Sequence, residues 1–475
     1  MQTFISETID DILIKQTSFE DCVFILPSQR AGVFVKDTFK KKIVNGFLPE
    51  IKTIESFVSE ISEITKADSI QLLFHFYSIY CEIEKYPDTF DIFSSWASVV
   101  LQDFNEIDQY LVNSNDIFTY LRDIQRMKKW SVKGEFKETE LIKDHLIYME
   151  KLGVYYSKFY LFLVEKKVGY QGLIYREATK KVYQFLEKNS HKKFFFIGFN
   201  ALNKAEETLF KIILDNQSSE IYWDLDTAFF NTAHSAGSFI RKYKKEWSYF
   251  EKNKLKLIGN NFSSQKNIEI IGAPKNISQL KYAGEILEKF NNHESTALVL
   301  GDESLLSVAL NSIPKNVSGI NITMGYPLQN VPSSQLIASI FQLFITQDTL
   351  QKSASNKFYY KDVIRFFKNS VIYQLVKGDS SETVLTIENN ISKQNNTFIN
   401  VSTIESYLKP LDKKNSSLLL AIFEPFITVE DFMTRILNLL DGAKDHVSVL
   451  EKEYLYRFHN AFNQLINLNK TKKYF

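Results

Sequence analysis

The 475-residue sequence has little cysteine, glycine or proline, and it contains no long uninterrupted hydrophobic run. Two cysteines, Cys22 and Cys81, cannot form a four-thiolate zinc or iron–sulfur site, and they do not suggest a disulfide framework. Sixteen glycines and nine prolines exclude collagen-like and proline-rich architectures. The most apolar stretch near the far end, residues 416–429, is interrupted by Glu424 and Pro425 and is shorter than the roughly 20 residues that span a bilayer.

An excess of charge of one sign is also missing. The chain has 57 basic and 56 acidic residues, a formal net charge of +1, so no global field draws it onto a polyanion, and nucleic acid would have to bind in a local groove. Only eight basic residues are arginine, which disfavours bidentate reading of bases. Residues 1–15 carry acidic residues where a signal peptide has a basic start and an apolar core. We therefore expect a soluble, cytoplasmic protein without a membrane partner.

The motifs of three catalytic classes are absent or isolated. The phosphate-binding pattern GxxxxGK[ST] does not occur, so ATP hydrolysis is not expected. The Pro87-Asp88 pair and the acid-x-Lys triplet of residues 135–137 lie among helical residues, where a chance match explains them better than a metal-dependent nuclease does. The seven histidines form no HxxxH or HExxH pair. The sequence therefore predicts no catalytic, metal-binding or cofactor-binding residue, and it leaves open whether the chain is an enzyme.

What the sequence does contain is a pattern of short buried strands that alternate with helices. Residues 22–26 are a continuous apolar run, and residues 50–54 are a second strand-like segment; helical periodicity follows each. Residues 193–197 and 220–225 repeat this pattern after a long helical stretch. This order is typical of an α/β fold with a parallel sheet.

The long helical stretch between these strands reads as an insertion. Apolar residues at steps of three and four from Trp96 to Leu111 predict one buried stripe. Farther along, Asn203 and Glu206 have the spacing of a capping box, which predicts the start of a helix. The solvent-facing side of the striped helix is assigned three acidic residues: Asp103, Glu106 and Asp108.

A second α/β unit is predicted in the middle of the chain. Residues 268–272 and 296–300 have the apolar character of buried strands, and residues 278–290 have helical periodicity between them. From about Pro332 the pattern is helical again. We therefore expect a second sheet after the first.

Six segments occur in an order and at a spacing similar to those of one known family. They are FILPSQRAGVFVKDTF, TIESF, WASVVLQDFNEIDQYL, FFFIGFNALNKAEETLF, IYWDLDTAFF and NITMGYPL. Together they resemble the amino-terminal, helicase-like part of AddB-like proteins, PD-(D/E)XK nuclease proteins related to the superfamily I helicases UvrD and RecB and to RecC. The resemblance implies two degenerate RecA-like parallel-sheet domains, each with a helical insertion. The implied divisions are residues 1–68 and 191–262 for the first domain, 69–190 for its insertion, 263–335 for the first part of the second domain and 336–475 for the second insertion.

The resemblance also implies that DNA is contacted by loops that follow strands of the first domain. PSQRA stands where one such loop would lie. TIESF is similar to the family's TxHSF-type motif, although Glu55 replaces the usual histidine. The implied DNA-binding residues are Ser28, Gln29, Arg30, Thr53, Ser56 and Phe57.

The departures from the family bear on activity. The ATP motifs are missing, as in inactivated helicase-like subunits, and the family's nuclease domain, which would need Mg²⁺, and its iron–sulfur cysteines have no counterpart before Phe475. We therefore expect a catalytically inactive module of a double-strand-break repair helicase–nuclease. It would guide single-stranded DNA or a duplex end beside a UvrD- or AddA-like helicase subunit, without a cofactor of its own. The alternative is a protein-interaction scaffold that holds the partner helicase and does not contact DNA.

Overall fold

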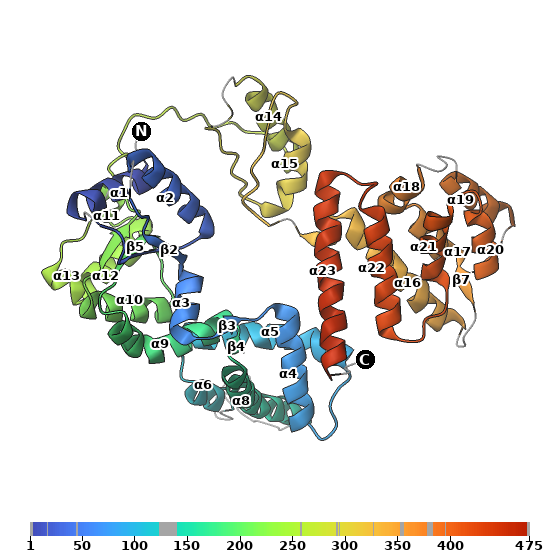
Figure 1. Ribbon diagram of the computed structural model, residues 1–475, viewed down its shortest axis with the longest axis horizontal. Helices are drawn as coiled ribbons and strands as arrows, with labels where there is room; N and C mark the ends of the chain where they lie inside the picture. The colour runs from blue at the N-terminus through green and yellow to red at the C-terminus, as the bar shows by residue number, and fades with distance from the viewer. Residues whose placement is uncertain are drawn as a thin grey trace, which may run out of the picture. The chain divides into compact units, whose positions relative to one another are not determined.

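The protein forms two compact units, Met1–Asn267 and Ile268–Phe475 (Figure 1). Helices predominate in both units, and the first contains a four-stranded parallel sheet, in agreement with the predicted α/β class. None of the helices in the described part of the chain is long and apolar enough to cross a membrane. The computed structural model describes residues 3–16, 18–43, 46–122, 140–256, 259–290, 293, 295–325, 327–351, 356–377, 383–394 and 396–472.

The four-stranded sheet of the first unit has the strand order β2-β1-β5-β6, and every neighbouring pair is parallel. The sequence predicted all four strands, with bounds that differ from the observed ones by at most two residues. β1 and β5 are central and almost wholly buried, which explains their continuous apolar runs. The strands are β1 (Cys22–Leu26), β2 (Glu50–Thr53), β5 (Lys193–Phe199) and β6 (Glu220–Trp223).

Both faces of this sheet are covered by helices (Figure 1). Alternate side chains of a strand point to opposite faces, so Phe24 faces one core and its neighbours Val23 and Ile25 face the other. The core that contains Phe24 is closed by α1 (Phe4–Lys15) and α2 (Gln29–Lys42). The opposite core is closed by α3 (Ile54–Ser62), α9 (Gln171–Lys188) and α10 (Lys204–Asn216).

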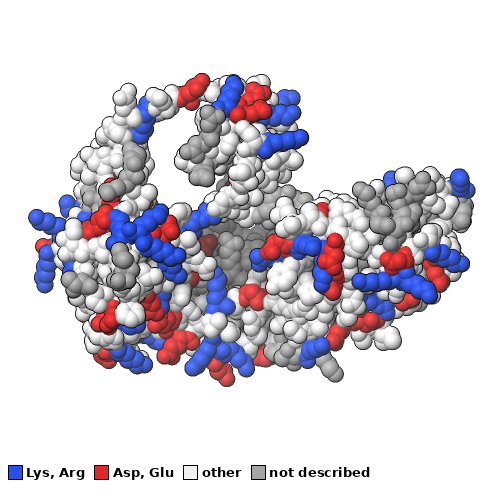
Figure 2. Space-filling model, turned by 45° about the horizontal axis from the view of Figure 1, so that its top comes forward, with Lys and Arg blue, Asp and Glu red and all other residues white. Residues whose placement is uncertain are grey.

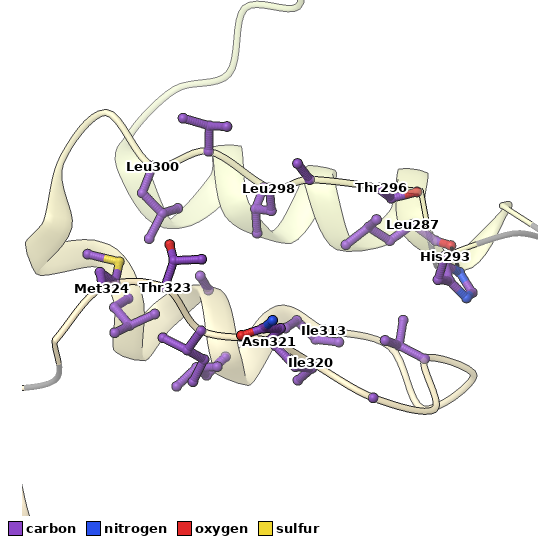
Figure 3. Close-up of a pocket in the computed structure, with 18 of the residues that line it drawn as sticks. Leu287, His293, Thr296, Leu298, Leu300, Ile313, Ile320, Asn321, Thr323 and Met324 are labelled. Atoms are coloured by element: carbon purple, nitrogen blue, oxygen red, sulfur yellow. Dashed lines mark hydrogen bonds between the residues drawn. The ribbon is translucent and has the colours of Figure 1, made fainter. Parts of the chain in front are cut away.

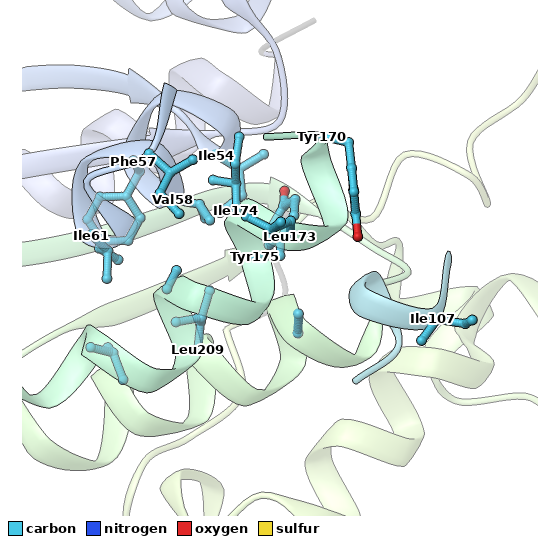
Figure 4. Packing of buried hydrophobic residues seen from close by; sticks show 14 of the residues in the cluster. Ile54, Phe57, Val58, Ile61, Ile107, Tyr170, Leu173, Ile174, Tyr175 and Leu209 are labelled. Carbon is cyan, nitrogen blue, oxygen red and sulfur yellow. The ribbon is translucent and has the colours of Figure 1, made fainter. Parts of the chain in front are cut away.

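In the second of these cores, α3 and α9 pack against one another (Figure 4). Ile54, Phe57 and Val58 of α3 are at most 6% exposed, and Leu173 and Ile174 of α9 are at most 1% exposed. Their spacing places them on one side of each helix. Three short helices complete the unit after β6: α11 (Thr227–Phe230), α12 (Ser238–Glu246) and α13 (Tyr249–Lys252).

A helical insertion leaves the first unit after α3 and returns before α9. A two-stranded parallel ladder closes its neck, where the amide of Thr65 donates to the carbonyl of Lys167 at 3.0 Å and that of Ala67 donates to Gly169 at 2.9 Å. The chain therefore re-enters the unit beside the point at which it left. The elements are β3 (Thr65–Lys66), α4 (Ser69–Ile83), α5 (Phe90–Gln109), α6 (Ser114–Arg122), α8 (Glu140–Lys166) and β4 (Val168–Gly169).

The assignment of Asp108 to the solvent-facing side of α5 is wrong. Its carboxylate is fully buried and accepts hydrogen bonds from the hydroxyls of Tyr156 and Tyr170 and, at 2.5 Å, from Nε of Arg176. Arg176 also donates to the carbonyl of Ile107, near the end of α5, at 2.9 Å. A buried carboxylate is tolerated when such donors surround it. The helical pattern did not reveal these donors, because they come from residues 48 to 68 positions away.

The amino-terminal edge of β6 carries a second polar cluster. Burial alone raises the pKa of the Glu220 carboxyl, but hydrogen bonds from Lys256, Lys193 and Tyr222 outweigh burial and lower this pKa to about 2. The ammonium of Lys193 lies 2.9 Å from Glu220, and the hydroxyl of Tyr222 lies 2.8 Å from both Glu220 and Asp11 of α1. The cluster thus joins α1 to the edge of the sheet.

In the second unit, the predicted strands at residues 268–272 and 296–300 are wrong. Within the described residues from 268 to 335, none is paired in a ladder, and the predicted helix between the two segments is α14 (Asn276–Glu288). A β-strand forms backbone hydrogen bonds with a neighbouring strand about 4.8 Å away, and these two segments have no such neighbour among the described residues. Residues 296–300 instead face residues 319–324 across a cavity of about 600 Å³, beside α14 and α15 (Leu306–Ser312) (Figure 3).

The rest of the second unit is helical from Pro332, as predicted, and encloses a core of its own. A short antiparallel pair, which the sequence did not predict, lies within it: β7 (Lys357–Tyr359) and β8 (Phe398–Asn400). The helices are α16 (Pro332–Gln351), α17 (Tyr360–Phe367), α18 (Ser370–Lys377), α19 (Thr383–Gln394), α20 (Val401–Leu408), α21 (Lys413–Phe423), α22 (Val429–Ala443) and α23 (Val449–Lys472).

The contact between α5 and α9 predicts an intolerance of side chains at Gly172. A Cβ atom there would lie 2.1 Å from the carbonyl oxygen of Asn105, and a backbone atom cannot move aside. Gly172→Ala should lower the free energy of unfolding by about 1–3 kcal/mol, measured by urea denaturation. Gly32→Ala is the matched control, because its Cβ would meet Ile51 at an ordinary 3.4 Å. Equal stability of the two variants would contradict this packing.

The Glu220 cluster predicts a pH dependence of stability. Because the folded-state pKa is lowered to about 2, its stabilisation is present above the ordinary carboxyl pKa and is lost as pH falls from about 4.5 towards 2. Glu220→Gln should cost about 3 kcal/mol at pH 7, and the difference from wild type should shrink below pH 4.5. Urea denaturation at several pH values measures this. The exposed Glu251→Gln serves as control, and a pH-independent difference for Glu220→Gln would refute the assignment.

Candidate functional site at the carboxyl edge of the sheet

The topology of the first unit singles out one edge of its sheet. From β1 the chain crosses to β2 on one side, whereas from β5 it crosses to β6 on the other. The direction of winding therefore reverses between the adjacent strands β1 and β5. In open parallel sheets, ligands bind outside the carboxyl ends of the strands at such a switch point. The residues that follow β1, β2 and β5 are therefore the candidates for a site.

Two helices begin side by side at this edge. Ser28 caps α2, with its hydroxyl accepting from the amide of Ala31 at 3.3 Å. Thr53 caps α3 by accepting from the amide of Ser56 at 3.2 Å. The parallel register pairs Leu26 with Thr53, so the segments that follow the two strands lie close together. The amino ends of both helices carry partial positive charge, which favours an anion nearby.

The other two strands end at the same edge. Gly198 interrupts the pairing of β5 with β6 and has a φ of +80°, a conformation that favours glycine. Asn203 then caps α10, and the predicted capping box with Glu206 is confirmed in both directions. After β6, Asp226 caps α11 by accepting from the amide of Ala228 at 2.9 Å. Four helices thus begin along one edge.

Five of the six predicted site residues lie at this edge with accessible surface. Ser28, Gln29, Arg30 and Ser56 are exposed, and Thr53 is half-buried because it caps α3. Phe57 differs, since it is 1% exposed and its ring lies 5.5 Å from that of Phe194 and 5.7 Å from that of Phe185. In this structure the ring of Phe57 is part of the core and is not open to a ligand.

The residues that follow β5 were not predicted as site residues. Asn200 and Lys204 are exposed beside Asn203, and Lys204 lies 3.3 Å from Glu207 with 53% of its side chain exposed. The segment FFFIGFNALNK contained the signal, because the ends of parallel strands share an edge and polar residues directly follow this strand.

The charges near the edge are mostly paired. Burial lowers the pKa of Lys52, but hydrogen bonds to Glu50 and Glu60 outweigh the effect of burial and raise this pKa. The ammonium of Lys52 is thus already paired with two carboxylates. Lys66 lies 3.4 Å from Glu55, with both side chains more than half exposed. A polyanion could therefore replace Glu55 as the partner of Lys66. It would not displace the two carboxylates that pair with Lys52. On the face drawn in Figure 2, basic and acidic side chains are interspersed, which agrees with the net charge of +1.

No family model matches the chain, and no curated protein matches it. The likeness of its six segments to AddB-like proteins thus stays a prediction from the sequence.

Two other candidate regions fit a polyanion less well. The cavity of the second unit is lined mainly by aliphatic side chains, and the described lining residues include no lysine or arginine (Figure 3). Asp88 of the Pro-Asp pair accepts a hydrogen bond from Tyr80 at 2.9 Å and so anchors the start of α5. The triplet Glu135–Lys137 lies outside the described residues. Among the described His, Cys, Asp and Glu, no group of three could hold a metal ion.

The position of Phe57 predicts that its substitution acts through stability. Phe57→Ala should lower the free energy of unfolding by about 3–5 kcal/mol, because it empties part of the core between α3 and the sheet. Urea denaturation measures the loss. Phe34→Ala, at a 56% exposed position of α2, should stay within about 0.5 kcal/mol of wild type. A Phe57→Ala variant as stable as wild type would show that its ring is not packed as described.

Proposed function

We propose that this chain is a catalytically inactive, helicase-like DNA-binding module of double-strand-break repair. In this proposal the first unit is a degenerate RecA-like domain with a helical insertion. The described residues from 268 to 335 form no ladder, so no second RecA-like domain is assigned to them. The observation that carries it is the pairing of Leu26 with Thr53, which brings the exposed residues 28–30 next to Ser56 at the ends of parallel strands. This is where a strand of DNA would run.

The chemistry of the edge supports contact with the phosphate backbone rather than with bases. The hydroxyls of Ser28 and Ser56 and the amino ends of α2 and α3 offer hydrogen-bond donors and positive potential. Arg30 adds a guanidinium, which can hold a phosphate through two parallel hydrogen bonds. Such contacts position DNA without reading its sequence, as a guiding module requires.

The same proposal assigns no catalytic residue and no cofactor to this chain. Its partners would be single-stranded DNA or a duplex end and a UvrD- or AddA-like helicase subunit, in the cytoplasm. Strand separation and hydrolysis of ATP would then belong to that partner.

A protein-interaction scaffold without DNA contact is the alternative function. It is favoured by apolar side chains that protrude near the start of α22 and α23 in the second unit. Ile427 is 95% exposed and Val449 is 87% exposed. Exposed apolar side chains contribute to sites where another protein binds when they form a contiguous patch.

Binding of single-stranded DNA at different salt concentrations tests the proposal. Wild type should bind an oligonucleotide at low salt and release it as salt rises. The double variant Arg30→Gln/Ser56→Ala should bind about tenfold more weakly, with a salt slope smaller by about 0.7, since one positive charge is removed. Arg457→Gln, which removes an exposed arginine from α23 of the second unit, should bind like wild type.

The outcomes separate the two functions. If wild type fails to retain the oligonucleotide at low salt, the scaffold is the better explanation. If wild type binds and the double variant binds equally well, DNA does not run along this edge.

A further inference from the structure

Helix α2 concentrates positive charge in a chain that is otherwise close to neutral. Its 14 residues carry five basic side chains and one acidic side chain, a net charge of +4, whereas the whole chain has +1. The basic residues are Arg30, Lys36, Lys40, Lys41 and Lys42. Lys42 is paired with Asp10 of α1, and the remaining positive charge of α2 is complementary to a polyanion.

One face of α2 is buried and the other is open. Gly32, Val35 and Phe39 follow a helical spacing and face the core with α1 and β1. On the outer side, Arg30, Phe34, Asp37 and Lys41 follow one another at steps of four, three and four residues, so they lie along one line of the helix.

Phe34 is the unusual member of this line. Its side chain is 56% exposed, although exposure of a phenyl ring to water is unfavourable in free energy. It lies one turn after Arg30, which follows β1 at the carboxyl edge. An exposed ring beside cationic side chains can stack on a nucleobase while the cations hold the phosphates on either side.

We propose that Phe34 is a stacking platform for a base of single-stranded nucleic acid, with Arg30 and Lys41 contacting phosphates before and after that base. This inference rests on the proposed function and adds the residue that holds a base. Arg30 and Lys41 are 11 residues apart, about 16 Å along the helix axis, which accommodates a few nucleotides. Lys41 lies 3.1 Å from Asp37, but their side chains are 75% and 57% exposed, so a phosphate can replace the carboxylate.

The partner's chemistry follows from the same charges. A purely apolar protein surface would desolvate Arg30 and the ion pair of Lys41 with Asp37 without supplying polar partners. A nucleic-acid strand supplies both an aromatic face and regularly spaced negative charge. Phe34 would also provide the exposed ring that the buried Phe57 cannot provide.

The experiment compares two oligonucleotides of equal length and charge, oligo-dT and a strand of abasic sites. Phe34→Ala should bind oligo-dT about 5- to 100-fold more weakly than wild type and bind the abasic strand equally well, because only a base can stack. The salt slope should stay unchanged, since no charge is removed. Phe34→Trp, which restores an aromatic face, should recover the affinity for oligo-dT.

Tyr183→Ala is the matched control. Tyr183 is 55% exposed and has Lys180 and Lys181 close to it in the sequence, but it lies on α9 and not on the outer side of α2. This variant should bind both strands like wild type. A loss as large as that of Phe34→Ala would show that exposed aromatic rings contribute without regard to position and would overturn the inference.

The failures can be told apart. Wild-type binding of oligo-dT that Phe34→Ala leaves unchanged, or weakens equally for the abasic strand, overturns the stacking role and leaves the proposed function standing. Absence of wild-type binding to either strand at low salt overturns the proposed function, and the stacking role with it.

Discussion

The burial of β1 and β5 on both faces is the constraint from which the first unit follows. Side chains that point alternately to two sides can leave water only if helices cover both sides. Parallel strands then require crossover connections, and helices in those connections form the cover together with α1, which precedes β1. As a result each of the four strands of this sheet ends, and a helix begins, at the same edge. The candidate site is thus a consequence of how the sheet is buried.

The helix α9 connects this α/β layer to the helical insertion. It packs on α3 and α10 of the α/β layer and also on α5 of the insertion, so the same helix belongs to both layers. At its amino end the glycine at position 172 permits the approach of α5, and Arg176 satisfies the buried carboxylate of Asp108. Steric fit and ion pairing therefore set the position of the insertion relative to the sheet.

Elements with strong local patterns could be predicted from the sequence, whereas contacts between distant residues could not. The strand at residues 22–26 was found because a run buried on both faces is continuously apolar. Asp108 was wrongly assigned to the solvent-facing side because its hydrogen-bond partners lie far along the chain. Phe57 was wrongly assigned to the accessible site because its position in a motif does not reveal that its ring is buried. The segments at residues 268–272 and 296–300 have strand-like composition, but composition does not specify a partner for pairing. The edge itself could be predicted, since topology alone determines it.

The short ladder between β3 and β4 has a consequence for how such a protein can change over evolution. The chain leaves and re-enters at paired residues, Thr65–Lys66 and Val168–Gly169, so the insertion is attached to the first unit at two neighbouring points. Loops of the insertion that do not pack on α9 can therefore change in length without altering the path of the chain through the sheet. The edge that joins strands to helices then keeps its geometry.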